Sequence, residues 1–301
     1  SGDDKRALVS WLVKQISYHS DLYYNQAAPE ISDADFDSLW SELKRLDPHN
    51  PQLEKVGSDA IPGSEKVTHL FPMRSLDKAT TIKEISHFVS ETTVNGRQFI
   101  CQPKLDGSAL SIEYRRGRLV RAATRGNGTR GEDVTANARR ISNVPESISW
   151  EGDCHIRGEV IMPLSTFNEK YSSVAPNPRN LAAGCLRQKT KNSGKAKPED
   201  LIFLAYDVKF PDPDSSHPDS PSPPVFIFDS DSNDWLSTIG IQIAGNTVVK
   251  GEDSTKITEK LSSITEYWTE KRGSIEWEID GVVIKLDLIS KRNNLGMTAH
   301  H

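Results

Sequence analysis

Lys104, Asp106 and Gly107 form a Lys-x-Asp-Gly tetrad, and Gln102 and Pro103 precede it. An uncharged lysine amine can attack the phosphorus atom of a nucleotide and form a phosphoramidate. An ordinary lysine is almost fully protonated at pH 7, because its reference pKa is about 10.4. A nucleophilic Lys104 therefore needs desolvation or a second cation nearby. The alternative is a simple turn, with Asp106 and Gly107 at its corner.

A strand that ends in Lys285 is the natural place to look for the second cation. Residues 278–285 contain a Val-Val-Ile run, which predicts a buried strand with Lys285 at its far end. A lysine is costly to place there without a partner. Lys285 would bind the phosphate oxygens of a dinucleotide and lower the pKa of Lys104. Alternatively, Lys285 is an edge-strand charge that discourages aggregation.

The elements that must position these lysines are predicted to be mainly strands. Strand-like runs cover residues 99–102, 109–114, 119–124, 155–161, 201–208, 225–228 and 278–286. The turn at residues 115–117 predicts a hairpin between two of them, and Asn127-Gly128 is a second turn signal. A short helix is expected over residues 82–89. The Pro-, Ser- and Asp-rich segment 210–224 is typical of an extended surface loop.

The first helix of the chain is predicted from one apolar stripe. Leu8, Leu12 and Ile16 recur every four residues, and Val9 and Val13 lie beside them. Such spacing places the five side chains on one face of a helix. We expect this face to be buried.

A second helix is predicted to follow Ser32, which is a favourable N-cap residue. Ile31 and Phe36 are spaced to form a hydrophobic staple. The buried face continues through Leu39, Leu43 and Leu46. Pro48 ends the pattern, so the helical module should end near Pro51.

Composition indicates a globular enzyme-sized chain without a membrane span. Of its 301 residues, 36% are hydrophobic and 26% are charged, which is ordinary for a soluble protein. No apolar stretch approaches the roughly 20 residues that cross a bilayer, and no signal-peptide pattern opens the chain. We therefore expect a cytoplasmic protein. Cys101, Cys154 and Cys185 are expected to be buried, inert thiols.

The net charge of −5 argues against a protein that coats nucleic acid through its overall field. Two basic runs could still contact phosphates locally, or could be solvated faces balanced by acids elsewhere. One run contains Arg115, Arg116, Arg118, Arg121, Arg125 and Arg130. The other contains Arg179, Arg187, Lys189, Lys191, Lys195 and Lys197.

Six ordered segments resemble a known family over nearly the whole chain. The Lys-x-Asp-Gly tetrad, the Arg-Gly-Glu-Val segment 157–160 and residues 278–285 resemble the nucleotidyltransferase superfamily of DNA ligases, RNA ligases and mRNA-capping enzymes. Tyr23-Tyr24 with residues 29–37, residues 124–135 and residues 177–188 narrow the resemblance to NAD⁺-dependent DNA ligases. The resemblance implies an α+β fold. A helical nicotinamide mononucleotide-binding domain over residues 1–60 would precede a mainly antiparallel nucleotidyltransferase (adenylation) domain over residues 61–301.

The resemblance also implies roles for the matched residues of the larger domain. Lys104 would be the adenylated nucleophile, and Asp106 an acid that serves nucleotide binding and the later joining steps. Glu159 resembles the carboxylate that holds the ribose hydroxyls, and Tyr206 the ring that stacks on adenine. The other matches are Arg125 and Lys285 as phosphate and ribose contacts, Ser75 and Leu76 at the border of the nucleotide, and Arg179 and Arg187 as contacts to the nicked DNA strand.

The helical module would bind the nicotinamide mononucleotide half of NAD⁺. Asp33 and Asp37 are four residues apart, hence on one helix face, near Tyr23 and Tyr24. Aromatic faces and carboxylates both attract the positively charged nicotinamide ring. The predicted contacts in this helix are Asp33, Ala34, Asp35, Phe36 and Asp37. The alternative for the two aspartates is compensation of the helix dipole.

Four residues depart from the family pattern. Phe36 replaces the usual tyrosine, so a ring is kept and a hydroxyl is lost. Gln102 stands where glutamate is usual, which would weaken an adenine contact but keep an acceptor oxygen. Leu181 and Cys185 replace smaller or more polar residues.

The family continues beyond the last residue of this chain into a strand with another catalytic lysine, an OB-fold domain, a zinc module and helix-hairpin-helix repeats. We therefore expect a piece of a longer ligase, with zinc only in the downstream part.

The implied reaction begins when Lys104 attacks the adenylyl phosphorus of NAD⁺ and releases nicotinamide mononucleotide. Mg²⁺ is expected to neutralise phosphate charge, through ligands that the sequence does not identify. In the full-length enzyme AMP would pass to the 5′-phosphate of a nick in double-stranded DNA. This chain, expected to be a monomer, would carry out self-adenylation at best.

Two other functions compete with this reading. An ATP-dependent DNA or RNA ligase, or a capping enzyme, would not need the tyrosine and aspartate module, because ATP has no nicotinamide. A non-catalytic nucleotide-binding protein would not need the full set of lysine, acid and arginine positions.

Overall fold

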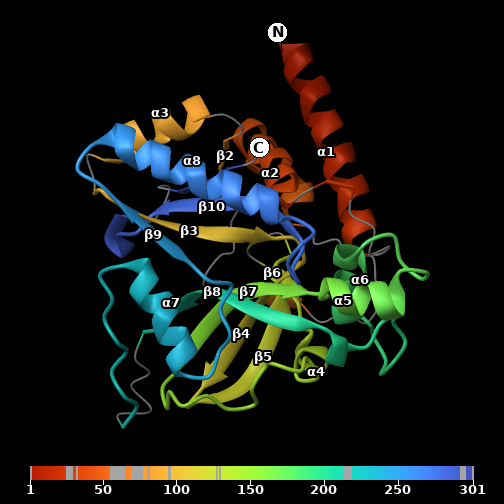
Figure 1. The fold of residues 1–301 in the computed structure, drawn as a ribbon. Coiled ribbons are helices and arrows are strands. Elements are labelled where there is room, and N and C mark those ends of the chain that lie inside the picture. The colour runs from red at the N-terminus through yellow and green to blue at the C-terminus, as the bar shows by residue number, and fades with distance from the viewer. Residues whose placement is uncertain are drawn as a thin grey trace. The chain divides into compact units, whose positions relative to one another are not determined.

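The computed structural model describes residues 2–24, 30–31, 33–54, 66–68, 77–79, 82–93, 96–126, 128, 130–212, 219–291 and 296–299. The chain divides into two compact units (Figure 1). The N-terminal unit comprises Ser1–Ser75 and Ala123–Asp133, and the large unit comprises Leu76–Ala122 and Val134–His301. The predicted division into residues 1–60 and 61–301 stays a prediction.

Two helices dominate the N-terminal unit, as predicted. They are α1 (Gly2–Tyr24) and α2 (Asp33–Leu46). Their shared core contains Leu12, Ile16 and Leu43. The prediction is wrong at Leu8, which is 39% exposed. Because α1 has 23 residues and α2 only 14, the shorter helix cannot cover the full length of the longer one.

The ends of α2 follow the expected signals. Ile31 and Phe36 belong to the same hydrophobic cluster, which agrees with a staple, whereas Ser32 lies outside the described residues. The helix ends at Leu46, before Pro48, and a 3-10 helix η1 (Pro51–Glu54) follows. The unit also contains an antiparallel pair, β1 (Lys66–Thr68) with β6 (Arg130–Glu132).

Two sheets form the centre of the large unit. The four-stranded sheet has the order β5 (Arg118–Thr124), β4 (Ser108–Arg115), β7 (Cys154–Ile161), β8 (Ile202–Lys209). The five-stranded sheet has the order β2 (Asp77–Ala79), β11 (Gly296–Ala299), β10 (Ile279–Leu286), β3 (Gln98–Leu105), β9 (Thr247–Lys250). Strands β2 and β11 pair in parallel. The pairing is antiparallel from β4 through β7 to β8, and from β11 through β10 and β3 to β9. The predicted mainly antiparallel α+β fold is confirmed.

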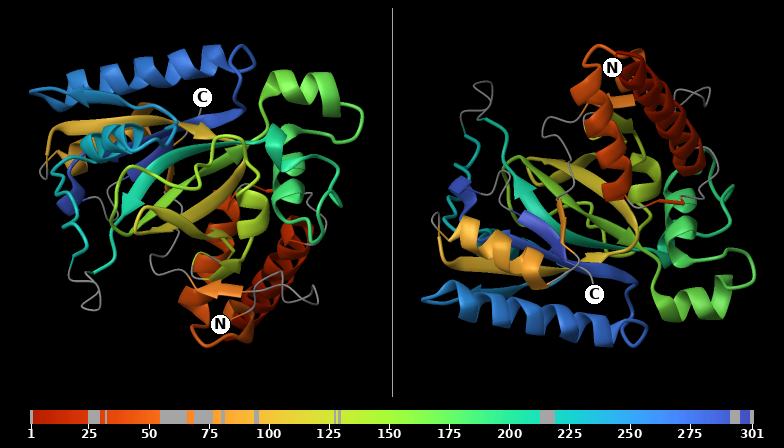
Figure 2. Two further views of the ribbon diagram at one scale, coloured as in Figure 1. Left: turned by 90° about the horizontal axis from the view of Figure 1, so that it is seen from below. Right: turned by 90° about the horizontal axis from the view of Figure 1, so that it is seen from above.

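Two helices cover one face of the five-stranded sheet. These are α3 (Ile82–Thr92) and α8 (Ser254–Lys271), which lie side by side on that face in Figures 1 and 2. Phe99 and Cys101 of β3 point into the core that they form. The side chains of Gln102 and Lys104 alternate with this pattern, so β3 presents Lys104 on the opposite face, toward the rest of the unit.

The remaining helices lie around the four-stranded sheet. They are α4 (Thr135–Ala138), α5 (Leu164–Thr166), the π-helical turn η3 (Phe167–Tyr171), α6 (Pro178–Leu186), the 3-10 turn η4 (Pro198–Asp200) and α7 (Asp229–Thr238), and a 3-10 turn η5 (Ile289–Lys291) follows β10. The largest core packs against this sheet and contains Ile156 and Val160 of β7. Arg157 and Glu159 alternate with them and lie on the other face.

A small apolar cluster joins the two sheets. It contains Leu105 of β3, Ile279 of β10, Ile161 of β7 and Leu204 of β8. It lies at the end of β3 that leads into the tetrad. The cluster therefore fixes the polar face of β3 relative to the polar face of β7, both within the large unit.

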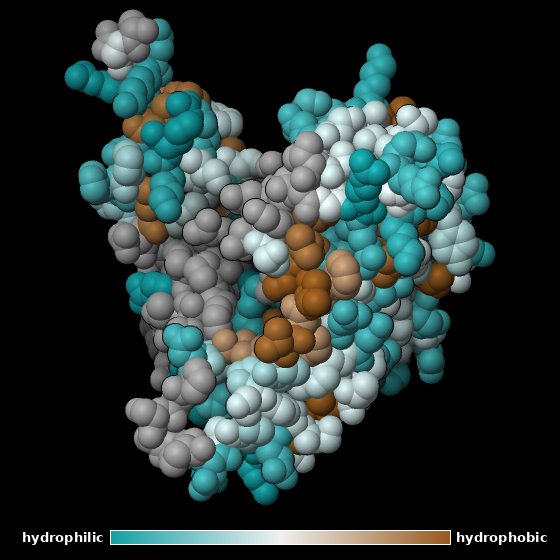
Figure 3. Space-filling model, turned by 90° about the vertical axis from the view of Figure 1, so that its left-hand side faces the viewer, coloured by the Kyte–Doolittle hydropathy of each residue, from teal (hydrophilic) through white to brown (hydrophobic). Residues whose placement is uncertain are grey.

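The predicted strand 225–228 is wrong. The segment is extended but forms a single bridge, between Phe228 and Leu288. Phe226 instead packs against the rings of Phe210 and Trp235, and Val225 is 92% exposed. Among the residues coloured in Figure 3, hydrophilic ones surround a central hydrophobic area. Among the described residues no helix is both long and apolar enough to cross a bilayer.

The predicted turns and thiols agree with the structure. Arg116 and Gly117 have φ values of 51° and 74°, as a tight hairpin turn between β4 and β5 requires. Gly128 has φ 91°, and its N–H donates to the Arg125 carbonyl at 3.0 Å. Asn127 lies outside the described residues. The three cysteines are buried, and burial raises the pKa of each thiol to about 12.

Gly107 provides a test of how the tetrad is held. A Cβ atom at this position would lie 2.2 Å from the carbonyl oxygen of Val160, so Gly107→Ala would force β4 away from β7. We expect the free energy of unfolding to fall by about 2–4 kcal/mol, as measured by urea titration. The neighbouring Ser108→Ala is the control, because the buried Ser108 hydroxyl has no hydrogen-bond partner among the residues that the structure describes. Equal stabilities of the two variants would contradict this view of the turn.

Candidate functional site

Lys104 lies near the end of β3 and not at the tip of a loop. Its side chain is 20% exposed, and its Nζ lies 3.3 Å from Oδ2 of Asp280. A bulge in β10 between Ile279 and Val282 places Asp280 beside this end of β3. The backbone N–H of Asp106 also donates to the Glu278 carbonyl at 2.9 Å. The tetrad is thus joined through Lys104 and Asp106 to β10 and to the residue that precedes it.

Lys285 has a carboxylate partner of its own. Its Nζ lies 2.8 Å from Oδ2 of Asp229, the first residue of α7, which is fully buried. Lys285 pairs with Ile100 in the sheet, four residues before Lys104, or about 13 Å along the strand. The structure therefore pairs each lysine with an aspartate, and the predicted placement of Lys285 as the cation beside Lys104 is not observed.

Asp229 is an unusual carboxylate because it is enclosed by protein. Burial raises the pKa of its carboxyl above the ordinary value; the ammonium of Lys285 opposes this shift, and the nearby Asp207 adds to it. Ser232 Oγ lies 3.3 Å from Oδ1 of the same carboxylate. The same hydroxyl donates to the Asp229 backbone carbonyl at 2.8 Å, so Ser232 lies between the backbone and side-chain oxygens of Asp229.

Gln102 is held by the next turn of the same helix. Its Nε2 donates to Oδ1 of Asn233 at 3.2 Å, and Nδ2 of Asn233 donates to the Asp229 carbonyl at 3.0 Å. Because Asn233 uses its nitrogen toward the backbone, its oxygen must face Gln102. The amide of Gln102 is consequently oriented with its nitrogen toward α7, and its oxygen remains as the acceptor.

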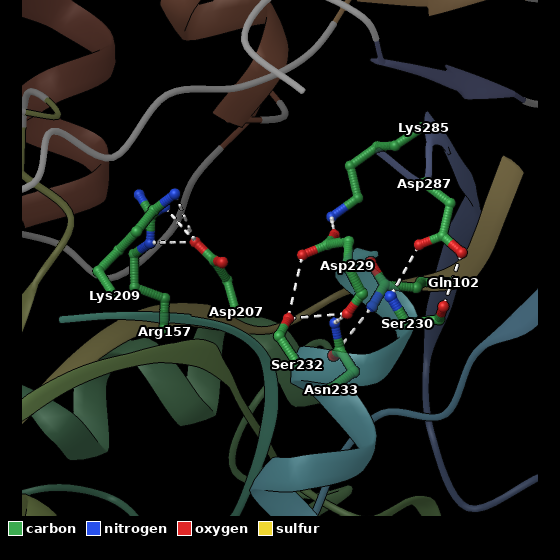
Figure 4. A network of polar contacts seen from close by, with 10 residues as sticks. All are labelled: Gln102, Arg157, Asp207, Lys209, Asp229, Ser230, Ser232, Asn233, Lys285 and Asp287. Atoms are coloured by element: carbon green, nitrogen blue, oxygen red, sulfur yellow. Dashed lines mark hydrogen bonds and ion pairs between the residues drawn. The ribbon is translucent and has the colours of Figure 1, made fainter. Parts of the chain in front are cut away.

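Arg157, Asp207 and Lys209 form a second polar group on the neighbouring sheet (Figure 4). Nε of Arg157 donates to Oδ2 of Asp207 at 3.0 Å, Nη2 bonds the same oxygen, and Nζ of Lys209 lies 3.9 Å from it. Burial disfavours the charged guanidinium, but Asp207, together with Tyr206 and Asp229, outweighs this and raises the pKa of Arg157. Glu159, two residues further along β7, is half-buried on the same face.

Tyr206 owes its position to a bulge in β8. Arg157 pairs with Asp207, whereas Gly158 pairs with Ala205, so Tyr206 is the extra residue between them. The backbone of Ala205 also bonds to another segment, donating to the Gln242 carbonyl at 2.9 Å and accepting from Ala244 N–H at 3.0 Å. Bulges of this kind commonly re-aim a side chain beside a site. The ring of Tyr206 is half-buried.

Asp106 and Arg179 are brought together. Nε of Arg179, in α6, lies 3.4 Å from Oδ1 of Asp106. Asn177 caps this helix by accepting from Asn180 N–H at 2.9 Å, and Pro178 follows at the first helical position, where it is favoured. Arg187, at the other end of α6, is buried. Contact of Arg187 with a DNA strand would thus require its exposure.

The N-terminal unit brings Asp37 and Arg125 together. Nη1 of the buried Arg125 bonds Oδ1 of Asp37, on α2. Phe36 is buried in the helical core beside Trp40, and Asp35 is exposed. Tyr23, Tyr24, Asp33 and Ala34 belong to α1 and α2, but their side chains lie outside the described part of the chain, as do Ser75 and Leu76.

Several residues of this site were not predicted to belong to it, among them Asp207, Lys209, Asp229, Asn233 and Asp280. Asp229 and Asn233 belong to α7, which the sequence did not predict because its residues are mostly Asp, Ser and Asn. The available signal was the pair of acids in its first turn, Asp229 and Asp231, which favour a helix start. No trio of His, Cys, Asp or Glu suited to a metal ion occurs within the described ranges.

Comparison with known proteins identifies the family. Residues 63–301 match the family model described as NAD-dependent DNA ligase adenylation domain, and residues 3–60 match the one described as DNA ligase-like, N-terminal NAD⁺-binding domain. Proteins named DNA ligase from Leptospira biflexa and Shewanella frigidimarina are 33% and 35% identical over 312 and 310 residues. These alignments cover 99% and 96% of this chain but only 43% and 44% of the relatives.

Solved structures are more distant. A putative ATP-dependent DNA ligase from Aquifex aeolicus aligns over 77% of this chain and 50% of its own, with 13% sequence identity and a TM-score of 0.44. This similarity is too low to support an inference. The adenylation-domain model, in contrast, matches well over half of the residues, and the chain therefore belongs to the NAD-dependent DNA ligase family.

Proposed function

We propose that this chain is the part of a DNA ligase that takes AMP from NAD⁺, with Lys104 as the residue that becomes adenylated. The observation that carries the proposal is the setting of Lys104. Its amine lies near the end of a strand, mostly shielded from solvent and oriented by Asp280. The chain spans less than half of the relatives it matches, so the nick-joining activity of a whole ligase is part of the proposal.

The proposed step is a displacement at phosphorus. Nζ of Lys104 attacks the adenylyl phosphorus of NAD⁺, an N–P bond forms, and the P–O bond to nicotinamide mononucleotide breaks. Nicotinamide mononucleotide leaves with the oxygen of the broken bond and its negative charge. The amine must lose protons to react, and the Asp280 carboxylate, 3.3 Å away, is placed to accept one.

The polar faces of the two sheets supply groups that suit the adenylyl half of NAD⁺. The oriented oxygen of Gln102 can accept from the exocyclic amine of adenine. The bulged Tyr206 offers a ring for stacking and Glu159 a carboxylate for the ribose hydroxyls. Lys285 offers a cation for phosphate oxygens. The proposed roles of Arg125 and of residues 33–37 concern the N-terminal unit and rest on the family resemblance.

Mg²⁺ is proposed to accompany the phosphates of NAD⁺. The described residues contain no preformed carboxylate cluster, and Mg²⁺ is commonly bound through substrate phosphates with only one or two carboxylates. When bound, the ion neutralises charge on the phosphates.

In the full-length protein, nicked double-stranded DNA is the proposed partner, and Asp106, Arg179 and Arg187 are the proposed contributors from this chain. Asp106 and Arg179 already share an ion pair, which would have to open for Arg179 to reach a DNA strand. A monomer in the cytoplasm is the proposed setting.

The function is tested by incubating the purified chain with Mg²⁺ and either NAD⁺ or ATP, followed by measurement of the intact mass. We expect a gain of one adenylyl group with NAD⁺ and none with ATP. A gain with ATP would indicate an ATP-dependent ligase or capping-type enzyme. No gain with either nucleotide would contradict self-adenylation and favour a binding protein.

A further inference from the structure

The first turn of α7 is polar and buried. Asp229, Ser230, Ser232 and Asn233 are each almost inaccessible to solvent. Burying four polar side chains in one turn is unfavourable unless each has a hydrogen-bond partner. Each of the four has one (Figure 4). A satisfied network of this density holds its members in one geometry.

The turn contacts two residues on the polar face of the five-stranded sheet. Asp229 bonds Lys285 of β10, and Asn233 accepts from Gln102 of β3. Both are residues to which the proposed function assigns nucleotide contacts. The other side chains of the turn bond within α7 or to Asp287, so the turn forms a polar layer behind these two residues.

Asp287 anchors the turn to the end of β10. Its backbone carbonyl accepts from Asp229 N–H at 2.9 Å, and its carboxylate accepts from Ser230 N–H at 2.7 Å and from Ser230 Oγ at 2.6 Å. Asp287 is only two residues from Lys285. Because Asp287 follows Lys285 so closely, its bonds to α7 fix the Asp229 carboxylate relative to the backbone of Lys285. Three hydrogen bonds join Asp287 to α7, so the loss of one would leave two in place.

The Lys285–Asp229 pair is asymmetric. The Asp229 side chain has no exposed area, whereas 15% of the Lys285 side chain remains exposed. The carboxylate therefore lies behind the ammonium, on its protein side. A pair needed only for packing could be replaced by apolar residues, because buried ion pairs seldom add net stability. The Lys285 ammonium contacts a carboxylate on its buried side and is partly exposed on the other, which suits it to bind an anionic ligand.

We propose that Asp229 is a positioning residue for the adenylation step, which holds the Lys285 ammonium where it meets the phosphates of NAD⁺. The proposal rests on the proposed function. Asp229 does not contact the nucleotide and acts through Lys285. Without the carboxylate, the flexible lysine side chain would sample other rotamers, and its charge would be less available at the phosphorus.

The test measures single-turnover adenylation with radiolabelled NAD⁺ over a range of concentrations. Asp229→Asn is expected to lower the maximal rate about 10–100-fold, with a smaller change in the half-saturating NAD⁺ concentration. In a Lys285→Gln background the same substitution should cause no further loss, because there is no ammonium to position. A purely structural role of Asp229 would instead slow both backgrounds by the same factor.

Two matched serine variants test the proposal if Asp229→Asn does not fold. Ser232→Ala removes a hydroxyl that supports the Asp229 carboxylate, and about a threefold slower rate is expected. Ser230→Ala removes one of three bonds to Asp287 and should leave the rate unchanged. A wild-type rate in Asp229→Asn, additive losses with Lys285→Gln, or equal rates in the two serine variants would overturn the proposal. Absence of adenylation in the unaltered chain would overturn the proposed function, and this inference with it.

Discussion

Lys104→Ala is expected to abolish the NAD⁺-dependent gain of AMP, a loss of at least about 10⁴-fold in rate. The phosphoramidate forms on Nζ of this residue, so its removal eliminates the bond-forming atom. Lys104→Arg should be equally inactive. Arginine keeps the charge that faces Asp280 but is not deprotonated in proteins, since its pKa lies far above neutral pH. The measurement is intact mass against time with NAD⁺ and Mg²⁺.

The control for this loss is an exposed lysine outside the site. Lys83→Ala, on the surface of α3, should retain the full rate of adenylation. Thermal unfolding of all three variants should resemble that of the unaltered chain, because Lys104 is not part of a hydrophobic core. A persistent gain of AMP in Lys104→Arg would show that the nucleophile is another residue.

Lys285→Met is expected to have the second largest effect, on both rate and stability. The adenylation rate should fall about 10²–10³-fold through loss of a cation at the phosphates. The free energy of unfolding should fall by about 3–5 kcal/mol, because the substitution leaves Asp229 as a buried charge without its partner. Urea titration of the variant and the unaltered chain measures the second effect.

The stability loss in Lys285→Met should depend on pH in a defined direction. Burial raises the pKa of Asp229 in the folded state, and removing Lys285 removes an influence that opposes this shift. Between the unfolded and folded pKa values, the folded state then binds more protons than the unfolded state. Stability therefore falls as the pH rises through this window. The variant should be less destabilised at pH 5 than at pH 8.

A double variant separates the stability effect from the catalytic effect. Lys285→Met/Asp229→Asn has no buried charge at this position, so it should regain much of the lost stability. It still lacks the cation and should remain as slow as Lys285→Met alone. Recovery of the adenylation rate in the double variant would show that the charge of Lys285 is not required.

Elements with a strong local pattern could be predicted from the sequence. The Val-Val-Ile run predicted β10, and the spacing of Leu12 and Ile16 predicted α1. The segment 225–228 has an equally apolar pattern but forms no strand; within the described ranges its single bridge joins Phe228 to Leu288. Whether an apolar run becomes a strand depends on an available edge, which lies elsewhere in the chain.

The charge partners of the site could not be predicted in the same way. Asp229 and Lys285 are 56 residues apart, and Lys104 and Asp280 are 176 apart. These pairs follow from the register of β3 with β10 and from the anchoring of α7. The sequence predicted a second lysine, Lys285, beside Lys104, whereas the register of β3 with β10 places Asp280 there. The fold selects the aspartate.

Mapping of the adenylated residue tests the central claim most directly. The chain is incubated with NAD⁺ and Mg²⁺, digested with a protease, and its peptides are analysed by tandem mass spectrometry. We predict a single adenylyl group, located on Lys104. Its location on any other residue, or unmodified peptides throughout, would contradict the assignment.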